Sequence, residues 1–302
     1  RGTGLLYDIG SHRLYAEHLG ATNPGPVILF EAGAGMWSAH WGELVRIVAR
    51  RMPVIVYDRG GLGRSDPGPR PRSFLTHAQE LSRLLDRILG RKHEPAFFVG
   101  HSYGARVVLS LLAQAPDRCQ GLVLLDGYVE GFEETTARLG LAPPSLAPWH
   151  LSALALGCDL GAVRAISAVA SLAVRLRRKP QSAPDLPGVD ESLVGAQLLD
   201  GSVWRTLRDE LTANGTDGPR VAYPATPCTQ PITVVSASRT LNPAHAPSGF
   251  AVDAYNEHWL DHQSTFVGLS QRARQIVLEG DHSLHLAQAE RVADIVIQAA
   301  SR

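Results

Sequence analysis

Pro95-Ala-Phe-Phe-Val-Gly-His-Ser-Tyr-Gly104 joins a short apolar run to a Gly-x-Ser-x-Gly pentapeptide, and the predicted fold depends on this stretch. Residues 96–99 are typical of a buried strand, and residues 105–115 continue with the apolar spacing of a helix. A strained turn between a strand and a helix brings them too close for side chains, which explains the two flanking glycines. The pattern predicts a tight turn that presents Ser102 as a nucleophile; a Gly-Ser turn without chemistry is the alternative.

The same alternation of strand and helix runs through the first 126 residues and returns near the C-terminus. Apolar runs typical of buried strands occur at residues 27–30, 54–57, 96–99, 121–125, 232–235 and 275–278. Helical patterns follow at about 41–50, 76–89, 105–115, 255–267 and 284–300. An antiparallel hairpin of residues 5–9 and 13–19 precedes them. This order predicts an α/β fold with a mostly parallel sheet and helices on both faces.

Between residues 127 and 231 the alternation gives way to helical patches separated by prolines. We expect this segment, 127–231, to be a helical cap inserted between core strands, with residues 1–126 and 232–302 forming the core domain. A second core that does not cover the site is the alternative. The apolar residues 153–176 end in a basic cluster, so contact with a membrane surface is a further, less favoured alternative.

The composition of the 302 residues limits the classes of function. Acidic and basic residues balance at 29 each, so no overall positive field attracts nucleic acid. Cys119, Cys158 and Cys228 are too scattered for a disulfide framework or a metal site. No run of about eighteen apolar residues is present, so we expect no membrane span. The sequence begins at Arg1, so the removal of a leader or membrane anchor is left open, and with it the compartment. The oligomeric state does not follow from the sequence.

A serine nucleophile needs a general base, and a loop histidine after the last strand of such a sheet can supply it. His282 has this position, because a predicted strand and Glu279-Gly-Asp precede it and a helical pattern follows. His285 is interpreted as a packing residue and His101 as a neighbour of the serine turn. The sequence therefore predicts His282 as the base.

The base in turn needs an acid, and in this type of sheet the order along the chain is serine, acid, histidine. Asp126 directly follows the predicted strand 121–125, at the edge where Ser102 also lies. The strand at 232–235 runs into a segment without a carboxylate, which favours Asp126. Asp253 and Glu257 are the alternatives.

Two backbone amides must stabilise the oxyanion, one from the residue after the nucleophile and one from a glycine-rich loop after an earlier strand. Tyr103 follows the serine, and Ala32-Gly-Ala-Gly35 forms the loop. We predict the amides of Tyr103 and Ala34 as the donors, with Gly33 as the neighbouring alternative.

Together these segments resemble the α/β-hydrolase superfamily, as a serine-nucleophile member with an inserted cap. Tyr57-Asp-Arg-Gly-Gly-Leu-Gly-Arg-Ser-Asp66 resembles the D-R-x-G-x-G-x-S segment of capped members, and Gly280-Asp-His282 resembles the histidine loop. The resemblance covers nearly all of the chain and implies that no metal or organic cofactor is needed. Asp126 matches an alternative acid position used in some dehalogenases. One departure from the family is that the oxyanion loop reads Glu31-Ala-Gly instead of the commoner His-Gly. Dehalogenases and epoxide hydrolases of this fold have aspartate at the position of the nucleophile, so Ser102 argues against both.

The predicted function is hydrolysis of a carboxylic ester, lactone or amide through an acyl-enzyme intermediate. We expect a small or medium apolar substrate under the cap, in contact with Gly33, Met36, Trp37 and Trp149. Carbon-carbon bond hydrolysis, lyase chemistry and ligand binding without turnover are the alternatives.

Overall fold

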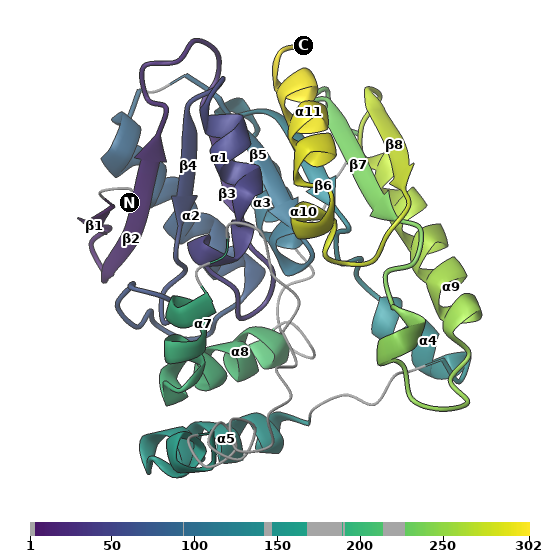
Figure 1. Cartoon of the computed structure of the whole chain (residues 1–302). Coiled ribbons are helices and arrows are strands. Elements are labelled where there is room, and N and C mark those ends of the chain that lie inside the picture. Colours follow the sequence, from purple (N-terminus) through teal and green to yellow (C-terminus); the bar gives the residue numbers. More distant parts are fainter. Residues whose placement is uncertain (1–3, 93, 142–146, 168–188, 190, 214–226) are drawn as a thin grey trace.

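A computed structural model describes residues 4–92, 94–141, 147–167, 189, 191–213 and 227–302 (Figure 1). In these residues one eight-stranded sheet has the order β1-β2-β4-β3-β5-β6-β7-β8. The strands are β1 Leu5–Asp8, β2 Arg13–Leu19, β3 Ile28–Glu31, β4 Val54–Tyr57, β5 Ala96–His101, β6 Cys119–Leu125, β7 Ile232–Ala237 and β8 Ala273–Leu278. β1 and β2 form the antiparallel hairpin, β2 runs antiparallel to β4, and the other neighbours are parallel. The predicted α/β fold is confirmed.

Helices cover both faces of this sheet (Figure 1). The core helices are α1 Glu43–Ala49, α2 Phe74–Leu89, α3 Tyr103–Gln114, α9 Val252–Ser264, α10 Leu284–Ala287 and α11 Ala289–Ala300. Side chains alternate across a strand, so Ile28 and Phe30 pack with α1 and α11 while Leu29 packs with α2 and α3. The resulting two apolar layers hold the carboxyl edge of the parallel strands in place.

Two predicted helices are broken in the structure. At 41–50, Gly42 has φ 57° and separates the short 3₁₀-helix Ser38–Trp41 from α1. At 284–300, Gln288 has φ −132° and separates α10 from α11. Apolar spacing continues through both breaks, which is why the sequence pattern did not reveal them.

The described residues between β6 and β7 include the helices α4 Phe132–Arg138, α5 Pro148–Asp159, α7 Glu191–Leu198 and α8 Gly201–Ala213. α5, α7 and α8 lie together at the bottom of Figure 1, and an ion pair of 2.5 Å joins Arg205 of α8 to Asp159 of α5. α4 instead packs on α9, where the rings of Phe132 and Trp259 are 4.7 Å apart. The cap boundaries stay a prediction, since residues 168–188 and 214–226, with the basic end of 153–176, lie outside the described residues.

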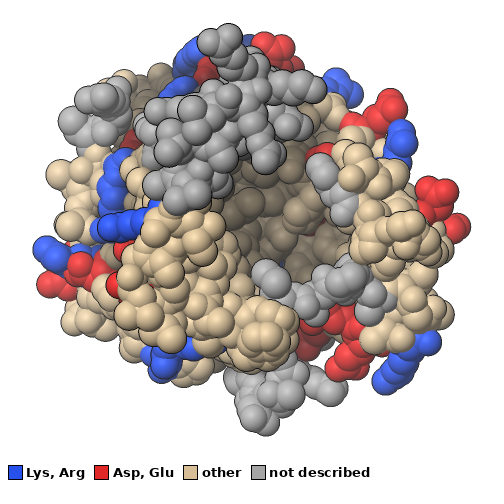
Figure 2. Space-filling view, turned by 60° about the horizontal axis from the view of Figure 1, so that its bottom comes forward, with Lys and Arg blue, Asp and Glu red and all other residues tan. Residues whose placement is uncertain are grey.

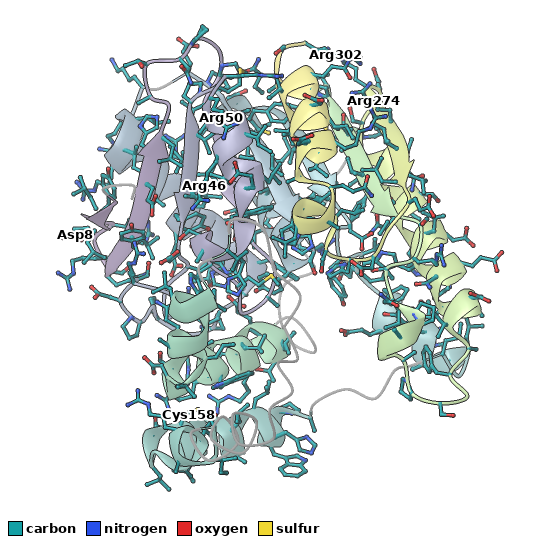
Figure 3. The ribbon with its side chains drawn as sticks, viewed as in Figure 1. Asp8, Arg46, Arg50, Cys158, Arg274 and Arg302 are labelled. Carbon is teal, nitrogen blue, oxygen red and sulfur yellow. The ribbon has the colours of Figure 1, made fainter. Side chains whose placement is uncertain are left out.

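All three cysteines are free, as their spacing predicted. Cys158 lies on α5 (Figure 3), while Cys119 begins β6 and Cys228 precedes β7. Within the part of the chain that the structure describes, no helix combines the length and the apolar character that a membrane crossing requires.

Gly104→Ala is expected to destabilise the fold. A Cβ at Gly104 would lie 2.2 Å from the carbonyl oxygen of Glu31 and 2.7 Å from that of Ala32, and backbone cannot move aside cheaply. Overpacking of this kind costs about 1–3 kcal/mol, which urea denaturation measures as a lower free energy of unfolding.

Gly195→Ala in α7 is the matched control, because a Cβ there meets no described atom within 4 Å. Alanine is favoured over glycine in a helix by roughly 1 kcal/mol, so this variant should be no less stable than the wild type. If Gly104→Ala were equally stable, the close approach of α3 to the end of β3 would be refuted.

Candidate active site

Ser102 occupies the turn between β5 and α3 in a left-handed backbone conformation, with φ 52° and ψ −119°. Among the described residues, Ser102 and Asp126 are the two non-glycine residues with positive φ. Each such position costs on the order of 1–3 kcal/mol and persists where the surrounding structure enforces it. A Cβ on Gly100 would lie 2.7 Å from Ala105 Cα, so strand and helix approach as closely as the pentapeptide predicts.

Asp126 follows β6, and its carboxylate is buried. Four donors bind it besides the nearby histidine: on Oδ1 the Ala237 amide at 3.0 Å, Trp259 Nε1 at 3.0 Å and Gln263 Nε2 at 2.9 Å, and on Oδ2 the Thr240 hydroxyl at 2.7 Å. Burial by itself raises the pKa of Asp126, but His282 and these donors outweigh it and hold the pKa below its ordinary value. The carboxylate is therefore kept ionised.

His282 lies on the loop between β8 and α10, and its Nδ1 is 2.6 Å from Asp126 Oδ2. Because a carboxylate only accepts, Nδ1 carries the proton and Nε2 is left as an acceptor. The His282 carbonyl oxygen is 3.0 Å from His101 Nε2, which ties the histidine loop to the serine turn. No hydrogen bond between described residues joins Ser102 Oγ to His282 Nε2. Such bonds are often long before a substrate binds.

The two alternative acids lie elsewhere. Asp253 and Glu257 are exposed on α9, whereas Trp259 and Gln263 of the same helix reach Asp126. The structure therefore brings Asp126, and neither alternative, against the His282 ring.

The glycine-rich loop after β3 lies against the serine turn. A Cβ on Gly33 would be 3.5 Å from Ser102 Cβ. Tyr103 opens α3, and the amides at a helix N-terminus point out of the helix toward an anion. The loop and the helix N-terminus thus meet at Ser102.

Two amides of this loop are already used. The Gly35 amide donates to Glu210 Oε2 at 2.8 Å, and the Met36 amide donates to the Gly33 carbonyl at 3.1 Å. The amides of Gly33 and Ala34 are the ones left beside the turn, so the choice between Ala34, the predicted partner of Tyr103, and its alternative Gly33 stays open.

The four residues predicted to contact the substrate differ in their exposure and in their position relative to the serine turn. Met36 lies next to Gly33, since a Cβ on Gly33 would be 3.0 Å from Met36 Sδ. Trp37 is 1 % exposed and packs with Val203 of α8, so its ring lies in the contact between the core and that helix. Trp149 is 66 % exposed on α5. Gly33 and Met36 therefore lie beside the Ser102 turn, whereas Trp37 is covered in this structure.

A recess beside the serine turn is lined by Ala32, Gly33, Met36, His40, Trp41, His101 and His285. The rings of His101 and His285 are 4.4 Å apart, and both side chains are buried. Burial lowers the pKa of His285 to about 3, that of His40 to about 4 and that of His101 well below its ordinary value. These histidines are neutral at pH 7, as expected of packing residues.

Figure 2 shows a hollow in one face of the molecule. Its visible floor consists of uncharged residues, and acidic side chains gather at one side of its rim (Figure 2). Within the described parts of the chain, no group of three or more histidine, cysteine, aspartate or glutamate side chains could hold a metal ion.

Sequence reasoning missed the buried ion pairs of Arg59 with Glu31 at 2.6 Å and with Glu210 at 2.8 Å. A signal was present, because Glu31 ends β3 and Arg59 follows β4, its parallel neighbour, so opposite charges meet at one sheet edge. It also missed Trp259 and Gln263 as partners of Asp126, although their spacing of four residues places them on one helix face.

Comparisons with known proteins identify the fold. Residues 25–148 match the family model described as the alpha/beta hydrolase fold. A protein named putative carbamate hydrolase RutD, from Azorhizobium caulinodans, is 34% identical over 125 residues, which are 41% of this chain and 45% of that protein. The match therefore spans less than half of that relative's length.

Solved structures give the same result over the whole chain. An enol-lactonase from Burkholderia xenovorans LB400 has a TM-score of 0.64 at 17% identity, with 99% of this chain and 100% of the other covered. A putative epoxide hydrolase from Pseudomonas aeruginosa has a TM-score of 0.63 at 16% identity, with coverage of 100% and 98%. At such identity the likeness shows the fold alone.

His285→Phe is expected to reduce the acid sensitivity of the fold. The folded protein keeps His285 neutral down to pH about 3, whereas the unfolded chain protonates it below its ordinary pKa of 6.5. The contribution of a neutral His285 to the free energy of unfolding is therefore complete above pH 6.5 and is lost as the pH falls toward 3. At pH 5 the loss amounts to about 2 kcal/mol.

The measurement is the free energy of unfolding by urea at pH 7.5 and at about pH 5, in the wild type and the variant. The difference between the two pH values should be smaller in His285→Phe. Identical differences in both proteins would show that His285 is not held neutral by the fold.

Proposed function

We propose that this chain, which belongs to the α/β-hydrolase superfamily, is a serine hydrolase that works through an acyl-enzyme intermediate. One observation carries the proposal: His282 Nδ1 lies 2.6 Å from the buried carboxylate of Asp126, on a loop that His101 ties to the Ser102 turn. Ser102 is half-buried on its turn, and a base that a buried acid orients near such a serine is the arrangement that acyl transfer requires.

In the proposed reaction Ser102 Oγ attacks the substrate carbonyl carbon while His282 Nε2 takes the hydroxyl proton. The carbonyl oxygen becomes an oxyanion, which the amides of Tyr103 and Ala34 stabilise, with Gly33 as the adjacent alternative. Collapse of this intermediate breaks the bond to the leaving group, which receives the proton from His282. Water then attacks the acyl ester on Ser102 and gives its proton to His282, which returns it to Ser102 Oγ as the bond to serine breaks and the acid is released.

Asp126 supports both half-reactions by stabilising the imidazolium. Its uncharged donors keep the carboxylate ionised without neutralising it, so the positive charge that forms on His282 is the natural counter-charge. The hydrogen bond to Nδ1 also fixes the tautomer that leaves Nε2 free to accept a proton.

We propose a small or medium uncharged ester, lactone or amide as the substrate. The visible floor of the hollow in Figure 2 is uncharged, which suits such a molecule. The similar proteins include one named a carbamate hydrolase and one titled an enol-lactonase. A carbamate fits the same mechanism, because it too is cleaved between a carbonyl carbon and a heteroatom. Turnover of acyl esters of graded chain length, lactones, amides and carbamates distinguishes these substrates.

Epoxide hydrolysis is disfavoured, although one similar structure is titled a putative epoxide hydrolase. Attack of a carboxylate on an epoxide gives an ester that water can cleave. Attack of Ser102 would give an ether, which the groups at this site cannot hydrolyse.

Fluorophosphonate labelling tests whether Ser102 is activated. We expect labelling of the wild type at Ser102, no labelling of Ser102→Ala, and loss of ester turnover in both Ser102→Ala and His282→Ala. A folded wild type that is not labelled, with turnover that His282→Ala leaves unchanged, would refute the serine mechanism. A wild type that binds esters without turnover would instead support a ligand-binding role.

Comparison of Asp126→Asn with Asp253→Asn tests the acid. Asparagine at position 126 favours the wrong imidazole tautomer, so kcat should fall on the order of 10⁴-fold. Asp253 is exposed on α9, so its substitution should change kcat little. The reverse result would move the acid from Asp126 to Asp253.

A further inference from the structure

Arg59 follows β4 and is 2 % exposed, at the contact between the core and α8 of the cap segment. A guanidinium has five N–H groups, and here each has an acceptor. The bonds are Nη1 to Glu31 Oε1 at 2.6 Å and to Ala32 O at 2.7 Å, Nη2 to Gly33 O at 2.6 Å and to Glu210 Oε2 at 3.3 Å, and Nε to Glu210 Oε1 at 2.8 Å.

Two of these acceptors are carbonyls of the loop that faces Ser102. The Ala32 carbonyl shares a peptide group with the Gly33 nitrogen, and the Gly33 carbonyl shares one with the Ala34 nitrogen. In a planar trans peptide the C=O and N–H bonds point in opposite directions, so a donor that holds a carbonyl also aims the N–H. Arg59 therefore sets the direction of the two candidate oxyanion donors, and its charge polarises them into stronger donors.

Glu210 fixes the next peptide group of the same loop. Its Oε2 accepts the Gly35 amide at 2.8 Å while the carboxylate also binds Arg59. Burial by itself raises the pKa of Glu210, but the Arg59 charge and the neighbouring donors outweigh it, so the pKa lies below its ordinary value. An ionised Glu210 thus joins the guanidinium to the loop.

Glu210 reaches this position because one face of α8 docks on the core. The contacting residues follow helical spacing: Val203, Thr206, Leu207 and Glu210. The Thr206 hydroxyl donates to the Gly61 carbonyl at 3.2 Å, and a Cβ on Gly35 would lie 3.1 Å from Leu207 Cδ1. The backbone of the loop therefore packs directly against side chains of α8.

We propose that Glu210 is a positioning residue for the oxyanion hole. From α8 it holds Arg59 and the Gly35 amide, and thereby aims the amides of Gly33 and Ala34 at the oxyanion. This inference rests on the proposed serine hydrolase function. It makes the transition state, more than substrate binding, depend on the docking of α8.

Glu210→Gln and Glu210→Leu test the proposal in the full chain. Glutamine keeps the shape but loses the charge and one of the two acceptor oxygens, and leucine loses both. With a p-nitrophenyl acyl ester, kcat should fall on the order of 10- to 100-fold in Glu210→Gln and further in Glu210→Leu. KM should stay within about threefold, since ground-state contacts are untouched. Circular dichroism and Tm establish that each variant is folded.

Asp209→Asn is the matched control. Asp209 directly precedes Glu210 on α8 and pairs with Arg70 and with Arg208, each at 2.7 Å, so its substitution removes the same charge and an ion pair to the core. It touches neither Arg59 nor the loop, and its kcat should equal that of the wild type. An equal loss in Asp209→Asn, or an unchanged kcat in folded Glu210→Gln, would overturn the positioning role.

Amide hydrogen exchange of residues 31–37 separates this inference from the proposed function. Exchange of the Gly35 amide should be faster in Glu210→Leu than in Asp209→Asn or the wild type, whether or not the protein turns over an ester. A wild type without turnover that shows this change refutes the hydrolase assignment and supports the hold of Glu210 on the loop. Unchanged exchange refutes that hold.

Discussion

The parallel pairing of β5 with β6 places the candidate chemistry. His101 lies opposite Leu125, so Ser102 and Asp126, the next residue on each strand, leave the sheet side by side at its carboxyl edge. Ser102 continues this pairing, with its amide 3.1 Å from the Leu125 carbonyl, whereas Asp126 continues the pairing of β6 with β7, with its amide 2.7 Å from the Val235 carbonyl. Both residues have positive φ, so the chain leaves the direction of its strand at each of them. His282, on the loop after β8, completes the candidate set of serine, acid and histidine.

Two buried charges at this edge are kept ionised by different means. Burial of a charge costs several kcal/mol unless hydrogen bonds compensate for the lost water. Asp126 receives neutral donors, so its negative charge stays available to a protonated His282. Arg59 receives two carboxylates, so its positive charge is balanced locally and it acts on the loop through the carbonyls it holds. The neutral donors around Asp126 suit proton transfer at His282, and the two carboxylates around Arg59 suit a rigid loop.

The balance around Arg59 also explains an unusual feature of the loop. The loop reads Glu31-Ala-Gly in place of the His-Gly that is commoner in the α/β-hydrolase pattern, and the Glu31 carboxylate accepts hydrogen bonds from both Arg59 and the Tyr57 hydroxyl. Removing that carboxylate would leave the guanidinium with Glu210 as its remaining anionic partner. Glu31 and Glu210 therefore join the sheet edge and α8 through one cation, and the fold alone does not dictate this arrangement.

The sequence by itself determined the fold and the candidate nucleophile and base, because these depend on local patterns: apolar runs, glycines where strand and helix approach, and polar residues directly after strands. It left the acid open between Asp126 and two residues of α9, and only the three-dimensional packing brought Asp126 to His282 while leaving the others exposed. The link from Glu210 through Arg59 to the loop was likewise decided by tertiary structure. Residues 59 and 210 are 151 positions apart, and no local pattern encodes which buried cation a distant carboxylate will meet.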